Sequence, residues 1–505
     1  MTPAIRFTMQ HERTLILLLC AIAAARVFIF SAAFPFFNNV DEQAHVDLVM
    51  KYARGQVPRD LGHYSPESAY SFSLYGTPEY FTAPQQLTTG TFPPPIWTLP
   101  VEQREDVINR TSAWWQANQN HESGEPPFYY AIAGSWLNLG RAIGITGCWL
   151  LYWVRFLNVF VAAILVWLGF VAAQLVFPDR PFMHLSVPLL LAVWPQTSFY
   201  SIQNDSLSPL FFGIAFVGLI KLLPADVPNL RLAIFTGLAI AATCLVKTTN
   251  IALLLVVGIA LIFKIRNLTE KGTSRPVLVS LAVLIVSAVV PIAVWFAWNY
   301  HTFGDLTATG SKIDFLGWTR KPISNWWPHP IFTFNGVKEF WPELIASFWR
   351  GELIWHGKRL ASQPTDAFYW ISSTLAIGVG VISLFPRLTK LTVFQRESLW
   401  LAFSSFAVLV LFVAILSMAF DFGLCVYPSR EHPYFISGRL LSAAAVPFFL
   451  LYCHALTWAL SWISRTWPRI ILVAGIALFI TVSQLAINRP TFSSRYNFFH
   501  LNQAL

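Results

Sequence analysis

Charged residues are scarce in this sequence. Asp, Glu, Lys and Arg together make up 12% of its 505 residues, which is about half of the share that is usual in soluble proteins. Hydrophobic residues make up 55%, and 21 residues are tryptophan. This composition excludes an ordinary soluble domain and indicates a polytopic integral membrane protein. The formal net charge of +9 therefore needs no nucleic-acid partner to explain it.

Cysteine and metal-ligand motifs are also rare. The chain has five cysteines, and Cys20, Cys244 and Cys453 fall within apolar runs. Cys148 and Cys425 could meet near one face of the membrane, but the pattern favours free, buried thiols over a disulfide or a metal site. The stretch "DEQAH" supplies only one histidine where an intramembrane metalloprotease of the H-E-x-x-H type needs two, so that class is excluded.

Apolar runs long enough to cross a membrane, which takes about 17 to 25 residues, are abundant. About eleven are present, most of them separated by short breaks, and they predict an all-α polytopic membrane protein that forms one integral membrane domain over residues 1–505. The fifth and sixth runs are short and joined by "LVKTTN", so they form either a hairpin of half-spans or one kinked unit. The predicted spans are 14–37, 149–177, 182–202, 207–223, 231–246, 248–264, 277–300, 366–385, 398–420, 438–460 and 470–487.

The distribution of Lys and Arg predicts how these spans are oriented. The clusters "FKIRNLTEKGTSRP", "PRLTKLTVFQR" and "SRTWPR" fall on one side if the spans alternate, and the positive-inside rule makes that side cytoplasmic. The opposite side then carries the two long polar segments, residues 38–148 and 301–365. Both carry Pro, Trp and Tyr, which favours packed loops with interfacial helices over flexible tethers. We therefore expect the working surface on the non-cytoplasmic face.

The first polar stretch after the first span is "NNVDEQAHVD", residues 38–47. Asn39 followed by Glu42 matches a capping box, which predicts that a helix begins there. Asp41 and His45 are four residues apart, so a helix presents both on one face at the membrane surface. A carboxylate and an imidazole in that position suit proton abstraction or metal binding, while helix capping explains the stretch equally well.

A second polar motif is "NHESGEPPFYYAIAGSWL", residues 120–137. Its double proline predicts a rigid turn into an amphipathic helix at the membrane interface. The two tyrosines of the motif, Tyr129 among them, are typical of an aromatic belt at headgroup depth. His121, Glu122 and Glu125 crowd the same outer surface and are candidates for function.

Polar residues at the ends of apolar runs are the third kind of candidate. Asn204 and Asp205 lie in the turn "SIQNDS", where such a dipeptide is usual. Lys247 lies in a strongly apolar region, where a charge costs about 2.5 to 3.5 kcal/mol unless it reaches the surface or a partner. The stretch "YPSREHPYFISGRLL" brings Arg430 and Arg439 to the outer mouth of a span, and an arginine that faces a cavity is a natural bidentate partner of a phosphate.

In their order along the chain, these motifs resemble the C-type (GT-C) superfamily of membrane glycosyltransferases, which take sugars from polyprenyl-phosphate carriers. The resemblance rests on "DEQAH" after the first span, "EPPFYY" before the second, "QND" after the third, "LVKTT" in the fifth and sixth, and "SGRLL" near the penultimate span. It covers most of the chain. It implies a GT-C-like fold in a multi-pass protein of the bacterial inner (plasma) membrane, with the active site facing the periplasm or exterior.

The resemblance also implies roles for individual residues. Asp41 would be the catalytic base or hold a divalent metal ion, Mg or Mn, with Glu42 as the alternative acid or second metal ligand. His45 would orient the base or help to hold the ion. Lys247 and Arg439 would lie near the lipid phosphate, and Arg439 is the better match.

Further residues are expected to bind substrate. Family members often carry a basic residue or histidine just before the double proline, whereas this chain has Glu125, which weakens a phosphate role at that position. Arg350, Lys358 and Arg359, in the second outer segment, suit a phosphate. The substrate-binding set also includes His121, Glu125, Tyr129, Asn204 and Asp205.

The implied reaction is transfer of a sugar from a polyprenyl-phosphate-linked donor to a lipid, glycan or protein acceptor by an inverting single displacement. Two alternatives stay open. A lipid-linked oligosaccharide flippase or transporter would carry more charges at the midplane of its helices and shorter outer loops. A polysaccharide polymerase or ligase would share the large outer loop.

Overall fold

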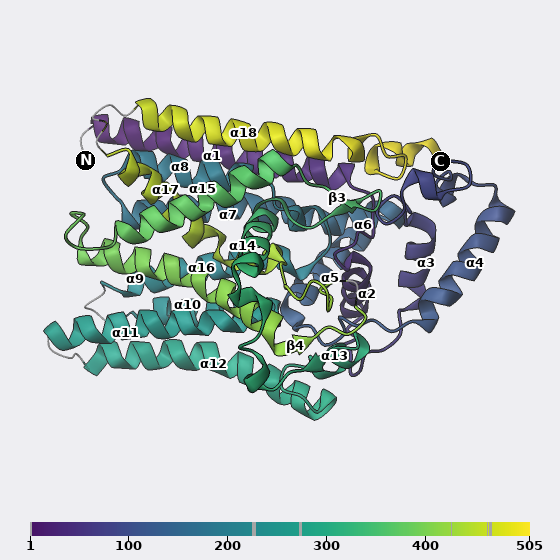
Figure 1. Ribbon diagram of the computed structural model, residues 1–505, viewed down its shortest axis with the longest axis horizontal. Coiled ribbons are helices and arrows are strands. Elements are labelled where there is room, and N and C mark those ends of the chain that lie inside the picture. The colour runs from purple at the N-terminus through teal and green to yellow at the C-terminus, as the bar shows by residue number, and fades with distance from the viewer. Residues whose placement is uncertain are drawn as a thin grey trace.

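The computed structural model describes residues 3–504 except 225–228, 272–274, 426, 462 and 464–466. The chain is 72% helical, and its long helices run side by side along the length of the molecule (Figure 1). This arrangement, with apolar helices throughout, is an all-α polytopic membrane protein. The predicted fold class is therefore confirmed.

Nine helical segments within the described residues are long and apolar enough to cross a membrane. They match nine of the predicted spans, and the other two form the shorter apolar helices α8 (Pro181–Val193) and α10 (Leu230–Val246). A 3-10 helix, Thr248–Leu253, separates α10 from α11, so the two are distinct helices rather than one kinked unit. The other apolar helices are α1 (Pro3–Ala33), α6 (Gly147–Arg155) followed by α7 (Leu157–Val176), α9 (Ser208–Leu222), α11 (Leu254–Lys271), α12 (Arg275–Phe303), α15 (Gln363–Ile382), α16 (Val393–Ala419), α17 (Ala445–Ala459) and α18 (Trp467–Phe492).

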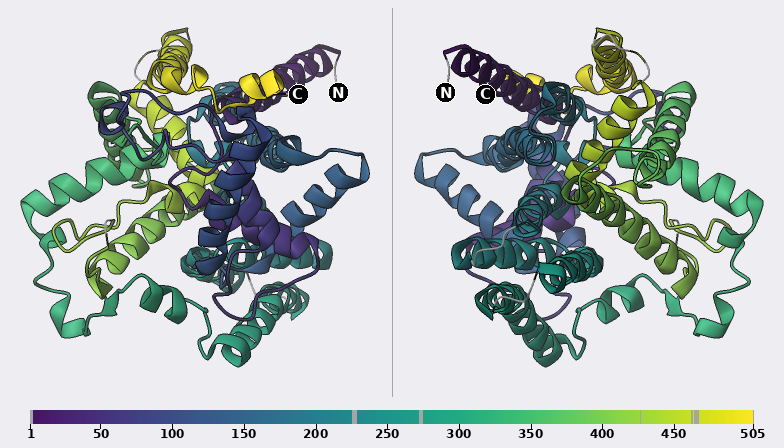
Figure 2. Two further views of the ribbon diagram at one scale, coloured as in Figure 1. Left: turned by 90° about the vertical axis from the view of Figure 1, so that its right-hand side faces the viewer. Right: turned by 90° about the vertical axis from the view of Figure 1, so that its left-hand side faces the viewer.

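The first long polar segment folds at the end of the molecule that lies opposite the amino terminus, on the right in Figure 1 and towards the viewer in the left view of Figure 2. The second segment lies nearer the middle of Figure 1, where its helix α14 (Phe334–Arg350) is labelled. The strands are two residues long and form two antiparallel pairs, β1 with β4 and β2 with β3. The elements are α2 (Glu42–Ala53), α3 (Pro66–Tyr75), α4 (Val101–Ala117) and α5 (Pro127–Ala142) in the first segment, α13 (Gly310–Phe315), β1 (Thr319–Arg320), α14 (Phe334–Arg350), β2 (Ile354–Trp355) and β3 (Lys358–Arg359) in the second, and β4 (Phe420–Asp421) after α16.

Helix α5 starts at the double proline and supports α2, the helix that follows the first span. Pro127 occupies the first helical position, where its missing N–H removes no hydrogen bond. Gly134 lets α5 approach α2 closely, because a Cβ atom there would lie 2.9 Å from the backbone nitrogen of Ala53. Tyr129 and Tyr130 are 1% and 0% exposed, so they pack in the core and the expected aromatic belt at headgroup depth is wrong for them.

The largest cluster of buried apolar side chains extends from the membrane helices into the two polar segments. It includes Val166 of α7, Leu48 of α2, Tyr130 of α5 and Leu344 of α14. Each fully buried side chain of this kind contributes about 1.5 to 3 kcal/mol relative to an exposed one. The helices of the polar segments are thereby fixed on the membrane helices, and residues from both polar segments meet around one cavity.

Candidate functional site

A cavity of about 1060 Å³ lies among α2, the turn before α5, α13, α14 and the segment before α17. It brings together residues that are up to 400 positions apart in the sequence, such as Asp41 and Arg439. Its charged and histidine lining residues are Asp41, His45, His121, Glu122, Glu125, Lys247, Lys312, Lys338, Glu339, Glu343, Glu352, Arg359, His432 and Arg439.

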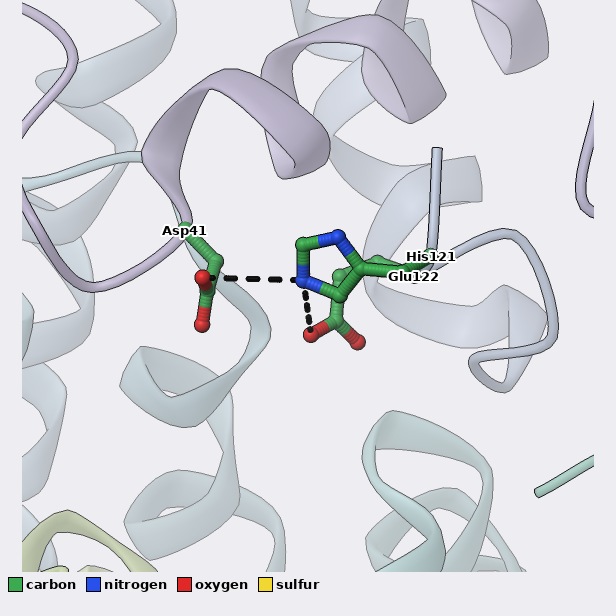
Figure 3. A group of neighbouring side chains, drawn as sticks. All are labelled: Asp41, His121 and Glu122. Atoms are coloured by element: carbon green, nitrogen blue, oxygen red, sulfur yellow. Dashed lines mark ion pairs between the residues drawn. The ribbon is translucent and has the colours of Figure 1, made fainter. Parts of the chain in front are cut away.

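Asp41 lies at the start of α2 in a left-handed backbone conformation, with φ at 62°. Few residues other than glycine adopt this conformation, and such strain is common at functional sites. Its carboxylate points towards the turn before α5, where the Nε2 atom of His121 lies 3.6 Å from Oδ1 (Figure 3). The same nitrogen lies 3.4 Å from Oε1 of Glu122, so one imidazole bridges two carboxylates.

The charges of this group of three stabilise one another. Burial raises the pKa of Asp41, but the His121 imidazole and the Arg439 guanidinium outweigh burial and lower it well below the usual range. Burial lowers the pKa of His121, but both carboxylates outweigh it and raise this pKa to about 9. The pKa of Glu122 is lowered, chiefly because Lys312 and His121 overcome the effect of burial. At neutral pH the group therefore contains two carboxylates and one imidazolium.

Lys312 and Glu125 extend the group along the cavity wall. Lys312 donates to Glu122 Oε1 at 2.6 Å and lies 3.8 Å from Glu125 Oε1, and these acids raise its pKa to about 12 against the effect of burial. Burial and, next, the charge of Glu122 raise the pKa of Glu125 to about 7. Asn204 Nδ2 donates to Glu125 Oε2 at 2.9 Å. Glu125 is therefore a carboxyl group poised to exchange a proton near neutral pH.

Arg439 and Lys247 supply the positive charge opposite Asp41. Arg439 nitrogens lie 3.5 Å from Asp41 Oδ2, 3.7 Å from Asp205 Oδ2 and 3.9 Å from Glu352 Oε2. Lys247 donates to both carboxylate oxygens of Asp205 at 2.7 Å, so the partner that its burial requires is present. Asp205 itself is 1% exposed and lies behind the wall that these two cations form.

Glu42, the residue after Asp41, points away from the cavity. It is 0% exposed, and Arg155 of α6 donates to both of its carboxylate oxygens at 2.7 and 2.8 Å. It also accepts the backbone N–H groups of Phe37 and Ile202 at 2.9 Å. These contacts use both carboxylate oxygens, so the expectations of Glu42 as catalytic acid and as a metal ligand with Asp41 are wrong for this geometry.

The predicted capping box is also wrong, because Asp41 rather than Asn39 precedes α2. The Asn39 side chain instead joins the two outer segments. Its Nδ2 atom donates to the carbonyl of Glu352 at 3.1 Å, and its Oδ1 atom accepts from the amide of Ile354 at 2.7 Å. This clamp holds Asp41 opposite Glu352 and Arg439.

The other predicted residues divide between the cavity and the core. His45 lines the cavity, with Nδ1 2.8 Å from the hydroxyl of Tyr130, and burial lowers its pKa to about 4. Tyr129 is buried, and Arg350 is 6% exposed and paired with Glu343 and Asp366, so neither lies on the cavity surface. The structure thus places Arg350 in a structural ion-pair network, contrary to the phosphate role expected for it.

Several charged or histidine lining residues were outside the predicted set, and three of them, Glu122, Lys312 and Glu352, contact the group around Asp41 and Arg439. Glu122 lies beside the predicted His121 and was noted only for its position on the outer surface. Lys312 lies in "SKIDF", a stretch without any motif, and Glu352 lies two residues after Arg350. Only Glu122 carried a sequence signal, because a second acid beside a histidine and before a double proline is a candidate metal or proton-transfer group.

Asp41, His121 and Glu122 could hold a metal ion if the His121 imidazolium releases its proton when the ion binds. Their ligand atoms all lie within 4.8 Å of one another. Ligands about 2.1 Å from an ion lie roughly 3.4 Å apart in a tetrahedral site, which matches the 3.4 and 3.6 Å separations of His121 Nε2 from the two carboxylates. A set of two oxygens and one nitrogen suits Mn²⁺ or Zn²⁺ better than Mg²⁺, which prefers oxygen ligands alone.

Comparisons with solved structures and with protein families found the following similarities. Solved structures of an oligosaccharyltransferase from the archaeon Archaeoglobus fulgidus are similar to it. The complex with Zn and sulfate is 11% identical, with a TM-score of 0.42, over 95% of this chain and 53% of that chain. The complex of the oligosaccharyltransferase AglB with an inhibitory peptide and a dolichol-phosphate is 12% identical, with a TM-score of 0.40, over 96% and 56%. The chain spans about half the length of these proteins.

The curated proteins contain no match to the sequence. A family model described as "Predicted membrane protein (DUF2142)" matches residues 26–420, which is most of the chain and includes α2, α5 and the residues around Asp41, His121 and Lys312. The chain therefore belongs to the predicted membrane protein family DUF2142.

Proposed function

We propose that this protein is a GT-C-type glycosyltransferase that moves a sugar from a polyprenyl-phosphate carrier to an acceptor hydroxyl on the non-cytoplasmic face, with inversion at the anomeric carbon. The observation that carries the proposal is the pairing of an ionised carboxylate with an arginine, Asp41 Oδ2 and Arg439 at 3.5 Å, inside one large cavity at the outer ends of membrane helices. A transfer of this kind needs a proton acceptor for the hydroxyl and positive charge for the phosphate.

Each residue has a separate role in the proposed reaction. The acceptor oxygen forms a bond to the anomeric carbon while the bond from that carbon to the phosphate oxygen breaks, and the electron pair leaves with the polyprenyl phosphate. Asp41 is ionised at neutral pH, so its carboxylate accepts the proton of the acceptor hydroxyl. Arg439 and Lys247 lie on the wall that faces the leaving phosphate and stabilise its charge.

Asp41, His121 and Glu122 would hold a divalent ion beside this phosphate position. The cations Lys247, Lys312 and Arg439 each already lie within 4.0 Å of a carboxylate, of Asp205, Glu122 and Asp41 respectively. A phosphate therefore gains from an added cation. When bound, the ion would supply that charge as a Lewis acid. Lys312 would hold Glu122 in place through its hydrogen bonds at 2.6 and 2.7 Å.

The test is transfer from a panel of radiolabelled polyprenyl-phosphate monosaccharides by the purified protein in lipid. Asp41→Asn should lower turnover about 10²- to 10⁴-fold while the protein stays folded, because the change keeps the shape and removes the base. Asp106→Asn on α4 is the matched control, since that side chain is exposed and outside the cavity. Undiminished turnover in Asp41→Asn would remove this residue from the site.

The same assay separates the alternatives. No cleavage of any donor, together with movement of lipid-linked glycans across the bilayer, would favour a flippase or transporter. Cleavage only of donors with a diphosphate link and a glycan acceptor would favour a polymerase or ligase.

A further inference from the structure

A second cavity, of about 1020 Å³, lies at the opposite end of the molecule from the charged cavity. It is formed where α7 joins α8, α15 joins α16 and α17 meets α18, at the left-hand end in Figure 1 and towards the viewer in the right view of Figure 2. The lining segments lie within residues 179–189, 388–391, 454–461 and 469–474. None of these residues lines the charged cavity, so this is a separate site.

The walls of this second cavity are mostly hydrocarbon. Helix α8 contributes Leu185 and Leu189, and α18 contributes Ile470, Val473 and Ala474. Because α8 and α18 are apolar helices that pack against each other in the membrane region, the cavity between them suits an acyl chain rather than a polar solute.

The rim, in contrast, is cationic. Arg180, Lys390 and Arg469 all line the cavity, and Asp179, which is exposed, is the acid among the described lining residues. The pKa of Arg180 is lowered, first by burial and then by the charge of Arg469, so the two guanidinium groups repel each other. In the described part of the chain, no carboxylate lies within 4.0 Å of Arg180, Arg469 or Lys390. An anion between the two arginines would relieve this repulsion.

The position of both arginines is fixed by other contacts. Arg469 Nη2 donates to the carbonyls of Leu460 and Ile463 at 3.0 Å, at the end of α17. The Arg180 guanidinium lies 4.9 Å from the centre of the Phe177 ring, which stacks on His454. The two side chains are thereby held at the mouth of the cavity instead of extending into water.

His454 provides a further polar atom inside the cavity. It is 1% exposed, and its Nε2 atom lies 2.9 Å from the hydroxyl of Ser383, while Nδ1 has no hydrogen-bond partner among the described residues. A buried polar atom without a partner costs about 1 to 3 kcal/mol, so a ligand with a hydroxyl group or a water would be favoured here.

We infer that this cavity binds one anionic phospholipid of the cytoplasmic leaflet. The phosphate lies between Arg180 and Arg469, with Lys390 beside it. An acyl chain occupies the apolar space between α8 and α18, and a hydroxyl of the headgroup lies near His454. Basic pockets between membrane helices on the cytoplasmic side are suited to anionic headgroups. The inference is independent of glycosyl transfer, because it uses neither the charged cavity nor a sugar donor.

The test uses the full-length purified protein with phosphatidylglycerol as the probe and phosphatidylcholine, which has no net charge, as the comparison. Native mass spectrometry and thermal unfolding should both show preferential binding of phosphatidylglycerol. Each cation removed, in Arg180→Gln and in Lys390→Gln, should weaken that binding about fivefold. Arg387→Gln is the matched control, because Arg387 is exposed in the same loop and outside the cavity lining.

A variant that changes no charge tests the apolar half of the site. Ala474→Trp fills the space between α8 and α18 and should abolish lipid retention while the cations remain. Equal binding of both lipids, or unchanged binding in Arg180→Gln together with Ala474→Trp, would overturn the inference. Equal protection by inorganic phosphate alone would also overturn it, because the cations would then hold a free anion and not a lipid.

Discussion

Asp41 and Glu42 are neighbours in the sequence, but they belong to two regions with opposite properties. Asp41 is 31% exposed on the wall of the charged cavity, and its partners His121 and Arg439 are separate groups that a substrate or an ion could displace. Glu42 is 0% exposed in the packed region behind that wall, and Arg155 and backbone amides occupy both of its oxygens. The comparison indicates that burial and partner geometry, not residue type, decide whether a carboxylate remains accessible on a cavity wall or is used up by internal contacts.

Replacing each of these two acids by its amide should give the largest difference in stability between the two regions. Glu42→Gln leaves the Arg155 charge buried without its counter-ion, which should destabilise the fold by about 3 to 5 kcal/mol and lower the yield of folded protein. Asp41→Asn should destabilise the fold by less than Glu42→Gln does, because the Asp41 side chain is partly exposed and its ion pairs are longer. Thermal unfolding in the same lipid measures both, and equal midpoints for Glu42→Gln and wild type would contradict the structural role.

The second prediction concerns the cation that faces Asp41. Arg439→Gln removes the guanidinium nearest to Asp41, so the affinity for polyprenyl phosphate should fall about 10- to 100-fold, the usual effect of one or two hydrogen bonds to a charged group. Arg430→Gln is the control, because Arg430 is an exposed arginine in the same segment and does not line the cavity. A fluorescent polyprenyl phosphate titrated into both variants gives the two affinities, and unchanged binding in Arg439→Gln would reject the phosphate assignment.

Much of the fold follows from the sequence, because the hydrocarbon core imposes a length and an apolar composition on every span. All of the predicted spans correspond to apolar helices, and the expected partner for Lys247 is present as Asp205. Only the division into two distinct helices around Thr248–Leu253 needed the structure, since a short polar break permits either a turn or a kink.

The site is harder to predict from the sequence than the fold, because most of its contacts join distant parts of the chain. Nothing near Glu42 in the sequence signals Arg155, which is 113 residues away, and nothing near Glu122 signals Lys312, which is 190 residues away. The tyrosines of "EPPFYY" have the composition of an interfacial belt, yet packing between α2 and α5 buries them. Most of the candidates, such as Asp41, His121 and Arg439, could be identified from the sequence, but which of them pair with one another could not.

A third, smaller effect is a loss of metal affinity that should differ between two acids of the cavity, Glu122 and Glu125. Titration with Mn²⁺, Zn²⁺ and Mg²⁺ by calorimetry should show that Glu122→Gln weakens Mn²⁺ or Zn²⁺ binding by about tenfold or more, because it removes a charged ligand of the possible site. Glu125→Gln is the matched variant, since Glu125 lines the same cavity but is not among the three clustered ligands. Equal losses in both variants, or none in either, would count against a site at Asp41, His121 and Glu122.

The last effect is a pH dependence of stability that arises from Glu125. Burial and the charges of Glu122 and Asp205 raise its pKa from 4.5 to about 7 against the opposing Lys312 and Lys247, so the folded protein holds a proton there that the unfolded chain releases. The stability that this proton supplies is complete below pH 4.5 and is lost as the pH rises through about 7.

Glu125→Gln keeps the side chain neutral and can still accept the hydrogen bond from Asn204, so it removes this loss. The free energy of unfolding of Glu125→Gln, relative to that of wild type, should therefore be higher at about pH 8 than at about pH 5, by at most about 3 kcal/mol. Thermal unfolding midpoints of both proteins at the two pH values measure this difference. Groups other than Glu125 titrate in both proteins and cancel in the difference. The control is Glu105→Gln, at an exposed position of α4, whose stability relative to wild type should be the same at both pH values. If the stability of Glu125→Gln relative to wild type falls as the pH rises, Glu125 is ionised in the folded protein.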